Sequence, residues 1–266
     1  MAAAAEPHTH CLWIADMLIY LDESYDNRHT FLLLGALLNP HPRYLHRRMS
    51  EIKRARGFIN ADGSLTELKY RDCRTEAHYV VARDVIDAFF DSTSWFRCIA
   101  VEQAKVDPSR FGKPHETDNI KKARAYKKFA ELLIGHNTEH LQGGVLLADS
   151  MTRCHGDEFL ERMRDVFAVP NSGHSIGKAS PTLRHIAEAD SAAEHYQVLQ
   201  VCDLLLGCVL NNLFPTANEW KNRLREHLVA RLGVGSLLPH DWQHYSKACV
   251  ETYWPKFNAW YWTPGS

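Results

Sequence analysis

The sequence predicts an α/β protein in which helices flank a mixed β-sheet, and three observations lead to this fold class. Short apolar runs of strand length alternate with longer segments in which apolar residues recur every three or four positions. The first two apolar runs, residues 17–22 and 31–38, are joined by a short polar stretch, which predicts a hairpin. The 266-residue chain is 45% hydrophobic, enough for one sizeable core. We therefore expect one main domain at residues 16–213, a flexible arm at 1–15, and a helical, aromatic-rich extension at 214–266 packed on the core.

The remaining elements follow from the same spacing rule. A strand needs only a short apolar or alternating run, whereas a helix needs an apolar stripe sustained over several turns. The helices expected on this basis span residues 42–56, 74–90, 119–135, about 158–167 and about 196–210. The further expected strands span residues 66–70, 95–103, 145–149 and 185–190. Strands that alternate with helices after an initial hairpin indicate a mixed sheet rather than a purely antiparallel one.

Composition excludes several classes of protein. The 31 Lys and Arg residues balance 32 Asp and Glu, which excludes a wholly polybasic nucleic-acid binder but allows a local basic groove. The seven cysteines form no Cys-x-x-Cys pair, which indicates a reducing compartment and neither a disulfide framework nor a zinc ribbon. No window reaches about 18 uncharged apolar residues, and the first residues do not resemble a signal peptide. We therefore expect a soluble, cytoplasmic protein with no membrane partner.

Asp203 lies in the middle of an apolar segment that is otherwise typical of a buried helix. Its neighbours three and four residues away are Leu199, Gln200, Leu206 and Gly207, so the helix itself supplies no cation. A carboxylate in such surroundings either takes up a proton or finds a compensating charge elsewhere. The position of Asp203 therefore requires an explanation from outside its own helix.

Two other acids stand at the ends of apolar strands. Asp22 ends the first run and Asp149 ends residues 144–148, so both are expected at one edge of the sheet, with Asp203 packed nearby. Glu67 and Lys69 alternate along one face of a short strand. The four acids predict a site for Mg²⁺ or Mn²⁺, with two ions that activate a water and stabilise the leaving oxygen of a phosphodiester. Lys69 would orient the nucleophile or neutralise charge on the phosphate.

Each acid also has a structural interpretation. A strand-terminal aspartate such as Asp22 or Asp149 can cap a helix or form a turn. The Glu67-Leu-Lys69 triplet is short enough to occur by chance. Asp203 caps nothing in mid-helix, so the combination of the four acids favours a metal site over four separate structural roles.

Several short motifs resemble those of the domain-of-unknown-function 3800 family. They are Leu21-Asp-Glu-Ser24 after a strand, Glu67-Leu-Lys69, Ala189-Asp-Ser191, Leu199-Gln-Val-Cys-Asp-Leu-Leu-Leu-Gly207 and the closing Phe257-Asn-Ala-Trp260. The main resemblance spans residues 17–212, and the family is regarded as ribonuclease H-like. It implies an α/β ribonuclease H-like fold with a mixed sheet and a metal-dependent nuclease activity. Tyr25 stands where the family usually has Gly, and Cys202 where it has Ala.

The resemblance also implies roles for individual residues. It puts Asp22, Glu67, Asp149 and Asp203 in the positions of the four metal-binding carboxylates. Gln200, one turn before Asp203, could bind a metal-bound water or a second acid. The remaining supporting residues are Glu23 and Ser24 beside Asp22, Asp190 as an extra ligand, and Ser191 as a cap of the Asp203 helix.

Two basic clusters and one aromatic cluster suggest contacts with nucleic acid. The basic clusters span residues 43–56 and 121–128; they predict a groove that follows phosphates, although a charged run is also typical of a solvated face. The aromatic residues of the C-terminal extension either pack on the core or stack on bases. The aromatic cluster includes Trp242, Trp254, Trp260 and Trp262. The basic residues expected to bind nucleic acid are Arg47, Arg48, Lys53, Lys121, Arg124 and Lys128.

Three functional hypotheses result from the sequence. The first is a metal-dependent phosphodiesterase that hydrolyses RNA or DNA with a ribonuclease H-like core. The second keeps this chemistry but assigns Glu67-Leu-Lys69 to a PD-(D/E)xK nuclease, which leaves Asp203 unexplained. The third is a catalytically idle module that binds nucleic acid or protein, in which the acids are structural. Self-association or a protein partner through the aromatic extension stays open, and no nucleotide-cofactor motif is present.

Overall fold

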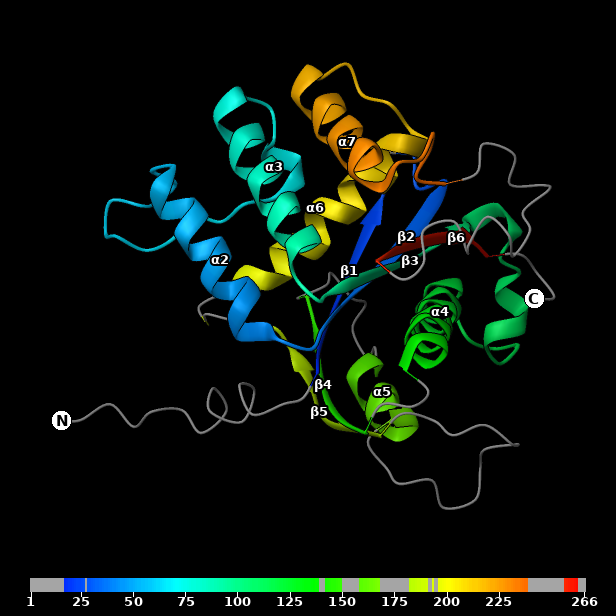
Figure 1. The fold of residues 1–266 in the computed structure, drawn as a ribbon. Coiled ribbons are helices and arrows are strands. Elements are labelled where there is room, and N and C mark those ends of the chain that lie inside the picture. The colour runs from blue at the N-terminus through cyan, green and yellow to red at the C-terminus, as the bar shows by residue number, and fades with distance from the viewer. Residues whose placement is uncertain are drawn as a thin grey trace.

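The protein folds around a six-stranded mixed sheet with helices on both faces (Figure 1). The structure is a computed structural model, and it describes residues 17–26, 28–138, 142–149, 158–167, 182–190, 193, 196–238 and 256–262. The strand order is β5-β4-β1-β2-β3-β6. The strands are β1 (Leu18–Tyr25), β2 (Phe31–Asn39), β3 (Trp95–Glu102), β4 (Gln142–Ala148), β5 (Thr182–Glu188) and β6 (Phe257–Tyr261). The α/β class and the mixed sheet expected from the sequence are therefore present.

The centre of the sheet is an antiparallel meander of β1, β2 and β3. The carboxylate of Asp26 closes the β1–β2 hairpin, because it accepts hydrogen bonds from the backbone N–H groups of Phe31 (2.7 Å) and Arg28 (3.0 Å). Strands β4 and β5 extend the sheet in parallel beyond β1, and β6 adds a parallel strand beside β3. The expected hairpin is thus confirmed, and β1 lies between β2 and β4.

The strands alternate their side chains between two apolar cores. Leu18 and Tyr20 of β1 belong to one core, whereas Ile19 and Leu21 belong to the other. Among the described residues, four helices cover the first core and two cover the second. The helices on the first face are α2 (Pro42–Ala55), α3 (Glu76–Asp91), α6 (Tyr196–Leu213) and α7 (Glu219–Leu232). Those on the second face are α4 (Asp118–Thr138) and α5 (Phe159–Phe167), and short 3₁₀ turns lie at Tyr70–Asp72, Gln103–Lys105 and Pro108–Phe111.

Helix α6 is seated closely on β1 and β2. The Cys202 thiol donates to the carbonyl oxygen of Gly35, at a sulfur–oxygen distance of 3.4 Å. A Cβ atom at Gly35 would come within 2.7 Å of the Leu206 side chain, so the glycine lets the helix approach the sheet. Gly207 has the same role toward the Tyr70 ring. This close packing sets the position of Asp203 relative to the strands.

The prediction of a strand at residues 66–70 is wrong. The segment is extended but pairs with no strand among the described residues, and a 3₁₀ turn begins at Tyr70. Its backbone N–H groups are bound by side chains of α6 instead: Leu68 N–H donates to Gln200 Oε1 (3.0 Å), and Tyr70 N–H donates to Asp203 Oδ2 (2.5 Å). An alternating pattern cannot distinguish these acceptors from those of a neighbouring strand.

The C-terminal extension contributes to the same fold. Helix α7 packs on the first core through Leu224 and Leu228, and β6 joins the sheet as an edge strand. The Trp262 ring contacts the Phe129 ring with centroids 4.9 Å apart, and the hydrophobic residues of β6 pack in or against the two cores. Trp242, Trp254 and the arm at residues 1–15 lie outside the described residues. None of the helices in the described part of the chain has the length and apolar character needed to cross a membrane.

Candidate carboxylate site and adjoining cavity

Asp22 and Asp149 lie next to each other on adjacent parallel strands. The register pairs Leu21 of β1 with Ala148 of β4, and Asp149 N–H donates to the carbonyl oxygen of Leu21 (2.8 Å). Asp22 continues the alternation of Leu18 and Tyr20, so its side chain faces α6. Only 5% of Asp22 is exposed. Asp22 does not end its strand as expected, because β1 continues to Tyr25 opposite β2.

Asp203 approaches the same place from α6. It is half-buried, and its Oδ2 atom accepts the Tyr70 N–H hydrogen bond described above. Gln200, one turn earlier, accepts the Leu68 N–H bond. The helix therefore holds the segment between Leu68 and Tyr70 across the sheet end through two side chains. The sequence singled out Asp203 and Gln200, but this backbone-binding role could not be read from it.

Glu67 and Lys69 point the same way and form an ion pair. Lys69 Nζ lies 2.9 Å from Glu67 Oε1, and the hydroxyl of Tyr196 donates to the same oxygen (2.9 Å). Burial would raise the pKa of Glu67, but the hydrogen bonds from Lys69 and Tyr196 hold that pKa below its usual value. Glu67 is thus ionised and oriented at neutral pH. Tyr196 is a site residue that the sequence did not single out.

The acids interact electrostatically. Burial, followed by repulsion from Asp203 and Asp149, raises the pKa of Asp22 well above its usual value. Burial also raises the pKa of Asp203 to about 6, although the Tyr70 N–H bond and the attraction of Lys69 act in the opposite direction. Carboxylates whose repulsion raises the pKa of Asp22 and Asp203 in this way form a site in which a bound cation would be stabilised.

The donor chemistry of these acids fits a hard divalent ion, since carboxylate oxygens are the ligands that Mg²⁺ and Mn²⁺ prefer. Nevertheless, within the described ranges no three His, Cys, Asp or Glu side chains are gathered closely enough to hold a metal. Asp203 and Glu67 instead accept the hydrogen bonds from Tyr70, Lys69 and Tyr196. Assembling three ligands at once requires these two side chains to move or to share their present bonds.

Lys53 does not lie on the predicted nucleic-acid surface. It is fully buried, and its ammonium donates to the carbonyl oxygen of Thr66 (2.8 Å) and to the side-chain oxygens of Gln197 (2.6 Å) and Gln200 (2.6 Å). Burial lowers the pKa of Lys53 to about 7. The prediction that Lys53 contacts nucleic acid is therefore wrong, because a run of basic residues does not reveal which one turns inward.

The other predicted basic residues are distributed over two sides of the sheet. Arg47 and Arg48 lie on α2 and pair with Glu51. Lys121, Arg124 and Lys128 lie on α4, which covers the opposite face, and two of them form ion pairs: Arg124 with Glu116 and Lys128 with Glu131. The two clusters therefore lie on different sides of the sheet.

The residues expected to support the metal site do not all lie beside the four acids. Ser24 follows the alternation of Asp22 toward the α6 face, whereas the Glu23 carboxylate accepts a hydrogen bond from the Tyr25 hydroxyl (3.2 Å). Asp190 is exposed just after β5. Ser191, the expected cap, lies outside the described residues. Asp22, Asp149, Asp203 and the Glu67–Lys69 pair thus remain the centre of the candidate site.

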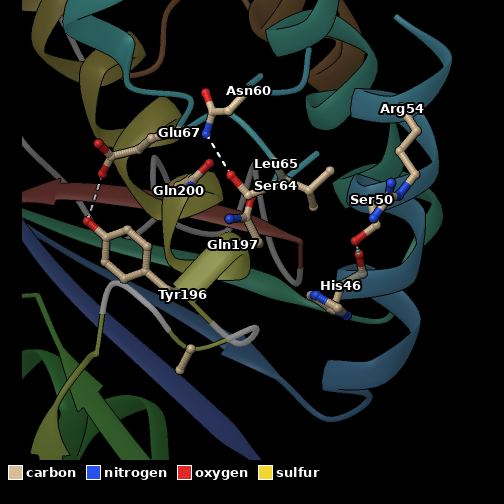
Figure 2. A pocket seen from close by; sticks show the side chains of 11 residues that line it. His46, Ser50, Arg54, Asn60, Ser64, Leu65, Glu67, Tyr196, Gln197 and Gln200 are labelled. Atoms are coloured by element: carbon tan, nitrogen blue, oxygen red, sulfur yellow. Dashed lines mark hydrogen bonds between the residues drawn. The ribbon is translucent and has the colours of Figure 1, made fainter. Parts of the chain in front are cut away.

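A cavity of about 690 Å³ adjoins the acids (Figure 2). Its walls are one side of α2, the loop at residues 60–67, and the start of α6. Figure 2 shows His46, Ser50 and Arg54 along α2, across from the Tyr196–Glu67 pair. Glu67 and Tyr196 belong to both the cavity and the carboxylate site. The sequence contained one signal for this cavity: His46, Ser50 and Arg54 are spaced four residues apart, which places them on one face of a helix.

No protein-family model matches the chain, and none of the curated proteins matches it. The resemblance to the domain-of-unknown-function 3800 family therefore depends on the motifs quoted above.

Proposed function

We propose that this protein is a metal-dependent phosphodiesterase that hydrolyses nucleic acid and has a ribonuclease H-like core. The observation that carries the proposal is the meeting of Asp22, Asp149 and Asp203, which arrive from two adjacent parallel strands and a covering helix. The mixed sheet with helices on both faces supports the fold implied by the motifs. The pKa values of Asp22 and Asp203, raised by burial and by repulsion from neighbouring carboxylates, support a role in binding cations.

The chain's own residues have distinct roles in this proposal. Bound Mg²⁺ or Mn²⁺ would supply an activated water and stabilise the leaving oxygen, with Asp22, Asp149, Asp203 and Glu67 as ligands. Lys69 lies beside Glu67 and is attracted to Asp149, so its ammonium would neutralise charge that develops on the scissile phosphate. Tyr196 would keep Glu67 oriented through its hydroxyl.

The test is cleavage of labelled single-stranded RNA, single-stranded DNA, both duplexes and a hybrid in Mg²⁺ or Mn²⁺. We expect Asp22→Asn and Asp203→Asn to reduce the rate by more than the roughly 10- to 100-fold that loss of an outer metal partner costs. Asp165→Asn is the matched control, because Asp165 is an exposed acid on α5, which covers the other face. Cleavage that survives in both site variants would contradict the proposal.

One observation favours an idle binding module as the second candidate. In the described part of the chain, no three potential ligands are gathered for a metal, and the Asp203 and Glu67 carboxylates already have hydrogen-bond partners. Titration of the purified chain with Mn²⁺ separates the two candidates, because the module predicts equal metal affinity for the native chain and Asp22→Asn. The PD-(D/E)xK alternative is disfavoured, since Glu67 and Lys69 lie on no strand and Asp203 takes part in the site.

A further inference from the structure

Two glutamines in the cavity lining, Gln197 and Gln200, have side-chain amides that are oriented by Lys53. In its protonated form Lys53 donates through Nζ to Gln197 Oε1 and Gln200 Oε1, and an ammonium can only donate. Both side-chain oxygens must therefore face Lys53, and both NH₂ groups must face away from it. Because Gln197 lines the cavity and is partly exposed, its NH₂ group is a hydrogen-bond donor on the α6 side (Figure 2).

Gln200 is the more deeply buried of the two amides. It is only 3% exposed, and its oxygen already accepts bonds from Lys53 and from Leu68 N–H. Its Nε2 atom is buried and has no hydrogen-bond partner in the described part of the chain. This nitrogen is closed off from the cavity, so Gln197 supplies the amide donor that a ligand can reach.

The opposite wall supplies a positive charge. Arg54 is exposed on α2 and lines the cavity, and among the described residues no carboxylate pairs with it. By contrast, Arg48 on α2 pairs with Glu51, and Arg56, just after the end of α2, pairs with Asp84. The other lining residues are polar except Leu65 and Ala193. A volume of about 690 Å³ is within the range of cavities that hold small molecules, about 300–1,000 Å³.

We propose that this cavity binds one phosphorylated nucleotide unit of a nucleic-acid strand, with its phosphate held by Arg54 and by the amide NH₂ group of Gln197. Guanidinium and amide donors are common ligands of phosphate oxygens in nucleic-acid complexes. Glu67 and Tyr196 connect the cavity with the carboxylates, so the strand would continue from the cavity to Asp22 and Asp203. The assignment to a strand depends on the proposed function, whereas the phosphate-binding chemistry does not.

The experiment measures binding to the full chain in EDTA, where no metal-dependent cleavage occurs. Nucleoside 5′-monophosphates are titrated calorimetrically beside the nucleosides that lack the phosphate. We expect the nucleotides to bind about tenfold more tightly or better, because a hydrogen bond to a charged group is lost with the phosphate. A short single-stranded oligonucleotide should displace the bound nucleotide. Equal affinity for nucleoside and nucleotide, or no displacement, would overturn the proposal.

Two variants locate the site. Arg54→Ala should weaken nucleotide binding about tenfold through loss of a charged contact. Gln197→Glu keeps an oxygen for Lys53 but replaces the NH₂ donor by a carboxylate oxygen, so it should also weaken binding without removing the Lys53 contact. Arg110→Ala is the control, because it removes the same charge from an exposed arginine in the turn that packs on α4. Thermal unfolding verifies that each variant is folded. Equal affinity in the two cavity variants and the control would contradict the assignment.

The experiments distinguish a failure of the cavity assignment from a failure of the proposed nuclease activity. Asp22→Asn should lose cleavage and keep nucleotide binding, since Asp22 does not line the cavity. Nucleotide binding that depends on Arg54 in a chain that cleaves nothing would contradict the proposed function alone. Metal-dependent cleavage by a chain whose nucleotide affinity is unaffected by Arg54→Ala would contradict the cavity assignment alone.

Discussion

Lys53 connects three segments that are distant in the sequence. Its buried ammonium binds the carbonyl oxygen of Thr66 and the side chains of Gln197 and Gln200, so α2, the 66–69 segment and α6 meet at one cation. Three acceptors match the three protons of an ammonium. The arrangement holds the segment that carries Glu67 and Lys69, and it orients the amides that line the cavity.

Lys53→Met should lower the free energy of unfolding by about 2–3 kcal/mol, since it leaves buried oxygen acceptors without a donor. Arg48→Met is the control on the same helix: Arg48 is half-exposed and paired with Glu51, so its loss should change stability by about 0.5 kcal/mol or less. Urea denaturation of both variants measures the difference. Equal effects would indicate that the Lys53 contacts do not contribute to stability.

The lowered pKa of Lys53 also predicts a pH dependence of stability. Burial lowers this pKa to about 7 in the folded chain, against 10.5 for the usual side chain. Between these values the unfolded state binds more protons, so the free energy of unfolding should rise with pH, by at most about 1.4 kcal/mol per unit from this group. The native chain should therefore gain stability relative to Lys53→Met between pH 7 and 10. Unchanged relative stability over that interval would show that the three acceptors keep the ammonium protonated.

At the scale of elements, α6 provides both a site residue and the support for a segment without a strand partner. The expected strand at 66–70 is bound to Gln200 and Asp203 side chains, one turn apart on the helix. Gly207, one turn further, makes room for the Tyr70 ring at the end of this segment. The carboxylate site therefore depends on how closely α6 and the segment pack.

Gly207→Ala should destabilise the protein by about 1–3 kcal/mol, because the new Cβ would lie 2.0 Å from Tyr70 Cγ and must displace the ring. The same substitution at Gly135 in α4 is the matched control. There a Cβ meets no atom within 4 Å, so alanine should stabilise the helix by up to about 1 kcal/mol. Thermal unfolding of the two variants should thus shift in opposite directions. A neutral Gly207→Ala would show that Tyr70 can move without cost.

At the scale of the whole molecule, the order of the strands and the packing of α6 determine where the carboxylate site lies. β1 lies between β2 and β4, so the Asp22 position is flanked on both sides and covered by α6 (Figure 1). The first core, with four helices, supports this face, while α4 and α5 close the other. The cavity between α2 and α6 opens beside the carboxylates on the same face.

If the carboxylates bind a divalent ion, the metal should stabilise the whole fold. Mg²⁺ or Mn²⁺ at 100 times its dissociation constant should raise the free energy of unfolding by about 2.7 kcal/mol, because the ion binds the folded state. Thermal unfolding with and without the ion measures this effect. Asp22→Asn should remove the shift and Asp165→Asn should retain it; an identical shift in all three chains would place the ion elsewhere.

The sequence by itself determined the hairpin, the apolar helix around Asp203 and the meeting of Asp22 with Asp149, because these depend on local periodicity and on the geometry of parallel strands. Only the tertiary structure decided the burial of Lys53, the attachment of residues 66–69 to α6, the pairing of β6 with β3 and the cavity beside Glu67. Each of these depends on partners far away in the chain: Lys53 and Gln200, for example, are separated by 147 positions. A local pattern specifies which groups need partners, whereas the packing of the whole chain decides which partners they find.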